Sequence, residues 1–194
     1  YFIGGKNMNS SIPSHVGVES IKPLKEIPLK DFFKNPEMSS FQMSPDGKYI
    51  SYMKPWEDGN RMMNVYVRPI DSESEVRITD ASKRSLYGYF WLNENRIAYV
   101  QDEGGDENIH IYAVNVDGTN NIDLTPFENI QARITDDLED DPNFMLVALN
   151  KRNPRIHDVY RLDVNSGDME MIAENPGNIS GWMTDNDGKL RIAT

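Results

Sequence analysis

The sequence repeats one strand-like pattern at a nearly constant interval. The segment KYISYM at residues 48–53 has counterparts in NRIAYV, NFMLVAL and KLRIAT, and each of the four follows a turn signal such as Pro45-Asp46-Gly47. Equivalent positions in these segments, 47, 48 and 45 residues apart, are Ile50, Ile97, Met145 and Leu190. A fixed period of this length indicates a chain built from repeated supersecondary units.

A second pattern repeats at the same interval. The segments NVYVRPID, HIYAVNVDG and DVYRLDVNSG place Tyr66, Tyr112 and Tyr160 in equivalent positions, 46 and 48 residues apart. Apolar, aromatic and β-branched residues between turn signals predict short β-strands. A repeat of roughly 45 residues with four short strands is typical of a β-propeller blade.

We therefore predict an all-β fold, an incomplete β-propeller of about three and a half four-stranded antiparallel blades. Strands of the first blade are expected at 39–45, 48–55, 63–71 and 75–80. Those of the second are expected at 88–94, 96–103, 108–117 and 121–127, and those of the third at 131–138, 143–151, 157–167 and 169–176. The propeller domain would occupy 37–194, with blades at about 39–80, 87–127, 131–176 and a truncated 179–194. Because propellers need roughly four blades or more to close, we expect this chain to be the N-terminal part of a longer protein.

The predicted second and fourth strands differ in pattern. Second strands are nearly continuously apolar, as at 97–100 and 144–149, which predicts burial on both faces. Fourth strands such as EVRITD and NIDLTP alternate, which predicts an outer, half-exposed strand. The aromatic cluster at 89–91 and Trp182 at the equivalent place in the fourth repeat are interpreted as packing between blades.

Residues 1–36 are expected to form a disordered or extended leader. Pro13, Pro23, Pro28 and Pro36 exclude a long helix or a central strand there. We expect these residues instead to form an extended segment that lies across the surface of a larger folded domain.

Charge and composition exclude several classes of partner and site. The 31 acidic and 20 basic residues give a net charge of −11, which has the wrong sign for binding nucleic acid. The chain has no cysteine, so disulfides, thiolate metal sites and thiol catalysis are excluded. No apolar stretch approaches the roughly 18 residues of a transmembrane segment. The sequence leaves the compartment unknown, with a periplasmic or secreted location favoured over a cytoplasmic one.

Longer stretches carry a family resemblance. SPDGKYISY, GYFWLNENRIAYVQDEGGDENIHIYAVNVDG, DDLEDDPNFMLVALNKRNPRIHDVYRLDVNSG and AENPGNISGW resemble the N-terminal propeller of bacterial serine peptidases of the prolyl oligopeptidase family, in the acylaminoacyl-peptidase and dipeptidyl-aminopeptidase branch. The resemblance covers about residues 27–194. It implies a propeller that restricts access of short peptides to a C-terminal α/β-hydrolase domain, which carries the catalytic Ser, Asp and His.

No catalytic residue is expected in this chain. The nucleophile of an α/β-hydrolase lies in a Gly-x-Ser-x-Gly elbow, and the segment at 177–181, GNISG, is one residue out of register. The alternative is a non-catalytic TolB-like propeller that binds a protein or peptide partner, since SPDGK also resembles repeats in such propellers. A Gly-x-Ser-x-Gly motif downstream would distinguish the two.

One acidic loop is the candidate for substrate binding. Residues 102–107, DEGGDE, join the second and third strands of the second blade, and Glu103, Asp106 and Glu107 are the candidate binding residues. Carboxylates there would pair with the free amino terminus of a peptide. We expect no metal and no cofactor: the acids at 136–141 and 185–187 are interpreted as turns, and His15, His110 and His157 as packing or surface residues.

Overall fold

The computed structural model describes residues 28–29, 37–58 and 60–194. The chain divides into two compact units, Tyr1–Asn35 and Pro36–Thr194. The predicted leader therefore lies outside the described residues except for positions 28 and 29. Within the described ranges, no helix is long and apolar enough to cross a membrane.

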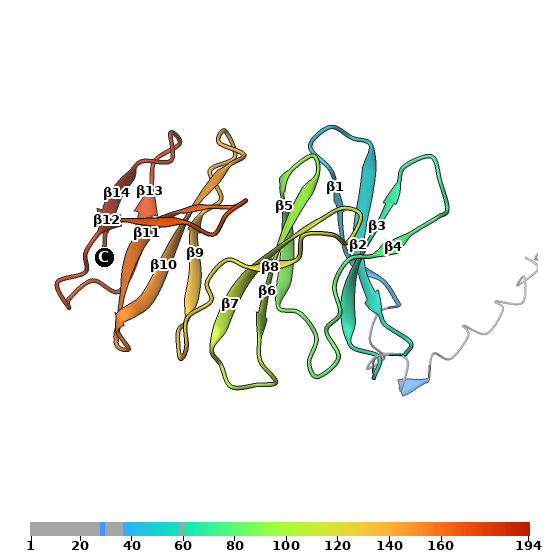
Figure 1. Ribbon diagram of the computed structural model, residues 1–194, viewed down its shortest axis with the longest axis horizontal. Coiled ribbons are helices and arrows are strands. Elements are labelled where there is room, and N and C mark those ends of the chain that lie inside the picture. Colours follow the sequence, from blue (N-terminus) through green and yellow to red (C-terminus); the bar gives the residue numbers. More distant parts are fainter. Residues whose placement is uncertain (1–27, 30–36, 59) are drawn as a thin grey trace, which may run out of the picture. The chain divides into compact units, whose positions relative to one another are not determined.

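The second unit consists of successive antiparallel sheets that follow one another in sequence order (Figure 1). Blade one contains β1 (Ser39–Met43), β2 (Tyr49–Pro55), β3 (Met63–Pro69) and β4 (Val76–Arg77). Blade two contains β5 (Gly88–Asn93), β6 (Arg96–Asp102), β7 (Ile109–Asn115) and β8 (Ile122–Asp123). Blade three contains β9 (Ala132–Asp136), β10 (Phe144–Asn153), β11 (Ile156–Asp163) and β12 (Met169–Ala173). The two strands β13 (Trp182–Thr184) and β14 (Leu190–Ala193) begin blade four.

These sheets confirm the prediction of about three and a half four-stranded propeller blades. In each complete blade, every strand pairs with its sequence neighbour, in the orders β1-β2-β3-β4, β5-β6-β7-β8 and β9-β10-β11-β12. In propellers the first strand of a blade lies nearest the ring axis and the fourth lies outermost. The order of strands therefore assigns β1, β5, β9 and β13 to the inner positions.

The fourth strands of blades one and two are shorter than the sequence suggested. Only two residues each are strand in β4 and β8. The hydroxyl of Thr79 accepts the backbone N–H of Val65 at 2.9 Å, and the hydroxyl of Thr125 accepts that of Ile111 at 3.0 Å. A side-chain oxygen thus takes the place of a backbone carbonyl, and the regular ladder ends.

The second strand of blade two contributes to two hydrophobic cores, as its continuous apolar pattern predicted. In β6, Ile97 and Tyr99 pack in the core between blades one and two, whereas Ala98 packs in the core between blades two and three. All three side chains are buried. The alternation of side chains along a strand distributes neighbouring residues to opposite faces, so both faces must be apolar.

The turn Pro45-Asp46-Gly47 is held by its own polar groups. The backbone N–H of Gly47 donates to the carbonyl of Ser44 at 2.9 Å, and the Asp46 carboxylate accepts the Ser44 hydroxyl at 2.7 Å. Gly47 has a φ of 72°, a left-handed conformation that glycine adopts without steric cost. The turn therefore fixes the register of β1 and β2.

Inner-strand aromatic residues connect adjacent blades. The indole N–H of Trp91 in β5 donates to the Ser51 hydroxyl in β2 at 3.0 Å, and the Tyr89 hydroxyl donates to the same oxygen at 3.1 Å. Trp182 in β13 likewise donates to the carbonyl of His157 in β11 at 3.1 Å. These aromatic residues thus join blade two to blade one and blade four to blade three, in line with the packing role inferred from the sequence.

Candidate functional site

Three hairpin loops lie on one side of the blades (Figure 1). They connect the second and third strands of each blade, at 56–62, 103–108 and 154–155. We call this side the hairpin face. The connections from each fourth strand to the next blade end on the same side, because consecutive strands are antiparallel. Loops from different blades can therefore act on one ligand at this face.

The predicted binding loop, 102–107 in the sequence, corresponds to the connection 103–108 in the structure and is organised around Asp106. Its carboxylate accepts the backbone N–H groups of Glu103 at 3.2 Å and Asn108 at 3.1 Å, and the side-chain amide of Asn108 at 3.0 Å. Partial desolvation acts to raise the pKa of Asp106, but these hydrogen bonds outweigh it and lower the pKa below its ordinary value. Asp106 therefore shapes the loop from inside.

The two glutamates of the same loop are exposed. Glu103 forms an ion pair with Lys83 at 3.3 Å, and both side chains are mostly in solvent. Glu107 has a left-handed φ of 61°, and its carboxylate has no partner among the residues that the structure describes. Of the three predicted binding residues, Glu103 and Glu107 thus present free or weakly paired carboxylates on the hairpin face.

Asp102, at the end of β6, is buried beside this loop. One of its carboxylate oxygens accepts the Arg84 guanidinium at 2.9 Å and the Tyr87 hydroxyl at 3.0 Å, while the other oxygen is buried without a partner in the described part of the chain. Burial raises the pKa of the Tyr87 hydroxyl, and its hydrogen bond to Asp102 adds to this shift. Sequence analysis did not identify this arrangement, since nothing in the spacing of residues 84, 87 and 102 indicates contact.

An acidic cavity of about 480 Å³ lies next to the loop, between blades one and two. Its lining includes the carboxylates of Asp80, Asp102, Glu103 and Asp123. The rings of Tyr99 and Tyr112, which also line it, stack with centroids 5.0 Å apart. Lys83 also lines the cavity and pairs with Glu103, but carboxylates outnumber cations there, so the cavity favours cationic groups.

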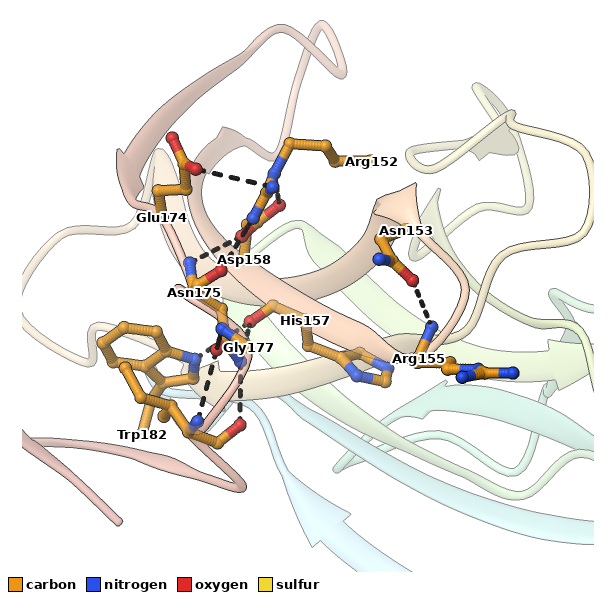
Figure 2. Close-up of polar contacts among 10 residues, drawn as sticks. Arg152, Asn153, Arg155, His157, Asp158, Glu174, Asn175, Gly177 and Trp182 are labelled. Carbon is orange, nitrogen blue, oxygen red and sulfur yellow. Dashed lines mark hydrogen bonds and ion pairs between the residues drawn. The ribbon is translucent and has the colours of Figure 1, made fainter.

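A second group of polar residues lies at the start of β11 (Figure 2). The Arg152 guanidinium donates two hydrogen bonds to the buried Asp158 carboxylate, at 2.9 and 3.0 Å, and a third to the carbonyl of Asn175 at 2.8 Å. Glu174 lies 3.4 Å from the same guanidinium. Burial opposes ionisation of Asp158, but the hydrogen bonds from Arg152 and from the backbone of Asn175, together with the charge of Arg152, outweigh burial and lower the pKa of this carboxyl. Because its charges are mutually paired, this cluster is structural.

The side chain of His157 points in a different direction from that of its neighbour Asp158. Its imidazole and the Arg155 side chain extend away from the Arg152 cluster in Figure 2. Both residues, together with Arg133 of β9, line a cavity of about 310 Å³ that reaches Trp182 of β13. Sequence analysis treated His157 as a packing or surface residue and did not select Arg133 or Arg155.

Metal ligation receives no support from the described residues, where no group of three or more His, Asp or Glu side chains is arranged to hold an ion. The acids at 136–141 and 185–187 line one open hollow of about 480 Å³ at the opposite ends of β9 and β13. Asp185 is held by Arg191 and by the backbone of Lys189 and Asp187, which lower its pKa. These residues form hairpin turns.

Comparison with curated proteins identifies relatives that are peptidases by name. The chain is 36% identical over 163 residues to dipeptidyl aminopeptidase BIII from Pseudoxanthomonas mexicana, a match that covers 83% of this chain and 23% of the relative. It is 28% identical over 177 residues to dipeptidyl peptidase family member 6 from Caenorhabditis elegans, covering 87% of this chain and 23% of that protein. The resemblance to propellers of the prolyl oligopeptidase family is confirmed. This peptidase-like propeller chain spans about a quarter of the length of the curated relatives it matches.

Solved structures confirm the propeller fold. The β-propeller domain of the trilobed protease from Pyrococcus furiosus matches with a TM-score of 0.50 at 17% identity, covering 72% of this chain and 44% of that one. An oligogalacturonate lyase in complex with manganese matches with a TM-score of 0.57 at 13% identity, covering 80% of this chain and 46% of that one. The fold of the peptidase-like propeller chain is thus shared with proteins of unrelated activity. No protein-family model matches the chain.

Proposed function

We propose that this chain is part of the substrate-gating propeller of a serine peptidase that acts on short peptides. The observation that carries the proposal is the 36% identity to a dipeptidyl aminopeptidase over 163 residues, on a propeller fold. The catalytic α/β-hydrolase domain of such an enzyme would lie outside these 194 residues, because no Gly-x-Ser-x-Gly elbow occurs in the sequence.

In this proposal the hairpin face borders the chamber through which peptides reach the catalytic domain. Its loops carry exposed charged residues that differ from blade to blade, such as Glu103, Glu107 and Arg155, whereas the strands that support them are fixed by buried apolar cores. A rigid scaffold with variable charged loops is suited to selecting substrates by their termini and charge.

Within this function, Glu103 and Glu107 remain our candidates for binding the free amino terminus of a peptide. Their carboxylates are exposed on the hairpin face, close to the acidic cavity that includes Glu103 itself. An ammonium group between such carboxylates forms charge-assisted hydrogen bonds, worth on the order of 1 to 3 kcal/mol when partly desolvated. Asp106, by contrast, is engaged by its own loop, so we assign it a supporting role.

The test uses the full protein encoded by the gene that contains this sequence. A fluorophosphonate probe, which labels activated serine nucleophiles, should modify one serine outside the 194 residues. Dipeptidyl chromogenic substrates with a free amine should be cleaved, and mutation of the labelled serine to alanine should abolish both labelling and cleavage. The 194-residue chain by itself should show neither.

A full-length protein without a labelled serine, together with further blades in place of a hydrolase domain, would instead identify a non-catalytic, TolB-like binding propeller. Peptide turnover by the 194-residue chain that followed the protein through repurification would contradict both alternatives, because the catalytic group would then lie within the propeller.

A further inference from the structure

The side chains of seven of the ten arginines of the chain have hydrogen-bond or ion-pair partners. Hydrogen bonds or ion pairs engage the guanidinium groups of Arg68, Arg77, Arg84, Arg96, Arg152, Arg161 and Arg191. Within the described residues, the other three, Arg61, Arg133 and Arg155, have no side-chain partner. Two of these three, Arg133 and Arg155, line the same cavity of about 310 Å³ between blade three and the start of blade four.

The lining of this cavity contains no carboxylate. Its ionisable side chains are Arg133, Arg155 and His157, in a chain whose net charge is −11. Two acids directly follow lining residues in the sequence. Asp158 is buried, paired with Arg152 and directed to the other side of β11 (Figure 2), and Asp136 accepts the Thr184 hydroxyl and the backbone N–H of Leu138. Two guanidinium groups therefore share one cavity without an internal counter-ion, an arrangement that favours an anionic ligand.

The pKa of His157 depends on the charges that line the cavity. Burial lowers the pKa of its imidazole, and the charge of Arg133 lowers it further. The Nε2 atom of His157 is buried without a hydrogen-bond partner in the described chain. Because both residues line the cavity, the charge of Arg133 contributes to the electrostatic field there.

The rest of the lining combines polar residues, such as Thr135 and Ser180, with an apolar part. Ile134 of β9, Ile156 of β11, Ile179 and Trp182 supply four of the remaining side chains. The volume, about 310 Å³, is at the lower end of ligand-binding cavities and suits one amino-acid residue better than a longer segment. A free phosphate or sulfate would leave this apolar surface unused.

We propose that this cavity binds a carboxylate attached to an apolar residue, with Arg133 and Arg155 contacting the carboxylate and the isoleucines and Trp182 contacting the side chain. The planar guanidinium donates two parallel hydrogen bonds to a carboxylate, which gives both affinity and orientation. In a peptidase the matching group is the C-terminal residue of a short peptide. That last assignment, unlike the site itself, rests on the proposed function.

The carboxylate site can be tested on the 194-residue chain without any peptidase activity. N-acetyl-leucine is titrated into the ¹⁵N-labelled chain and followed by NMR, in parallel with N-acetyl-leucinamide, which lacks the charge. We expect N-acetyl-leucine to shift resonances of residues around Arg133, Arg155 and Trp182, and to bind at least tenfold more tightly than the amide. The double variant Arg133→Gln/Arg155→Gln should lose at least tenfold in affinity.

The matched control is Arg61→Gln. Arg61 is also an arginine without a side-chain partner in the described chain, it lies in the 56–62 loop of the hairpin face, and its replacement removes the same charge away from the cavity. This variant should bind N-acetyl-leucine as the parent chain does. Because all three arginines are exposed, the variants should retain the parent's circular dichroism spectrum.

Equal affinity for the acid and the amide would overturn the proposal, as would an equal loss in the Arg61→Gln control. Inorganic phosphate that binds as tightly as N-acetyl-leucine and is lost in the double variant would show a general anion site in place of the one proposed. Preference for N-acetyl-glutamic acid α-amide over N-acetyl-leucine would assign the cavity to acidic side chains and refute the C-terminal assignment. If N-acetyl-leucine binds but the full-length protein is no peptidase, the site stands and only its peptide assignment fails.

Discussion

Asp158 in blade three and Asn64 in blade one hold the same structural position. Each lies two residues before the recurrent tyrosine of its third strand, Tyr160 or Tyr66. Each accepts a backbone N–H from the connection to the next blade at 2.7 Å, from Asn175 in one case and from Ala81 in the other. Blades one and three thus share a side-chain acceptor at this position but differ in its charge, whereas blade two has His110 there, which pairs with Asp123.

Replacement of Asp158 should separate its role as a hydrogen-bond acceptor for Asn175 from its role as the charged partner of Arg152. Asp158→Ala leaves the buried N–H of Asn175 without an acceptor and removes the partner of Arg152, which should lower the free energy of unfolding by about 3 kcal/mol. Asp158→Asn keeps an acceptor, as Asn64 does, and should cost about half as much. Urea unfolding of the chain followed by circular dichroism measures both, and equal losses would contradict the shared role.

The reverse substitution in blade one, Asn64→Asp, changes few atoms but should strongly lower the free energy of unfolding. The side-chain amide of Asn64 donates to the carbonyls of Met62 at 3.1 Å and Ala81 at 2.8 Å. Asn64→Asp places a buried carboxylate oxygen against these carbonyls, and no guanidinium of the described residues is hydrogen-bonded to position 64, so the substitution should cost about 3 kcal/mol. The same urea experiment applies, with Asp158→Asn as the isosteric control. If Asn64→Asp loses less free energy of unfolding than Asp158→Asn, blade one tolerates a carboxylate at this position.

Much of the fold follows from residue patterns that act locally. The continuous apolar run Ile97-Ala98-Tyr99 predicted a strand buried on both faces, and these residues do divide between two cores. The Pro45-Asp46-Gly47 signal predicted a turn because its groups satisfy one another within four residues. The fourth strands were predicted too long, because threonine hydroxyls end the ladders, and this depends on side-chain geometry across the sheet.

The sites were less predictable because they depend on contacts between distant positions. Arg133, Arg155 and Trp182 meet at one cavity although they are up to 49 positions apart and share no motif. Loop composition grouped Asp106 with Glu103 and Glu107, but backbone conformation decides which carboxylate turns inward. The left-handed φ angles of Gly104, Gly105 and Glu107 direct the loop so that its N–H groups meet Asp106.

The stability of the chain should decrease as the pH falls through the titration range of His157. Burial, aided by Arg133 and opposed by Asp158, lowers the pKa of this histidine from 6.5 in the folded state. Below pH 6.5 the unfolded chain then binds more protons than the folded chain at this position, so the free energy of unfolding falls as the pH falls, and the effect is absent well above 6.5. His157→Gln should reduce the difference in urea midpoint between pH 7.5 and pH 5.5.

Arg133→Gln provides the control for this pH effect. It removes the charge that helps to lower the pKa of His157 but retains the imidazole, so its pH dependence should lie between that of the parent chain and that of His157→Gln. A His157→Gln variant with the pH dependence of the parent chain would show that other groups control stability in this range.

The exposed glutamates of the 103–108 loop should determine recognition of a free amine in the proposed full-length peptidase. Glu103→Gln/Glu107→Gln keeps side-chain size and removes two carboxylates that make at most weak surface contacts, so the loop should stay folded. We expect kcat/KM for a free-amine peptide to fall by about tenfold or more, roughly 1.4 kcal/mol, with little change for its N-acylated form. Glu170→Gln, which removes an exposed charge from outer strand β12, is the matched control and should change neither value.

Asp106→Asn should weaken the hydrogen bonds that shape the loop and reduce amine selectivity without removing an exposed carboxylate. Equal kinetic effects on both substrates in the double variant would show that the loop does not bind the amino terminus.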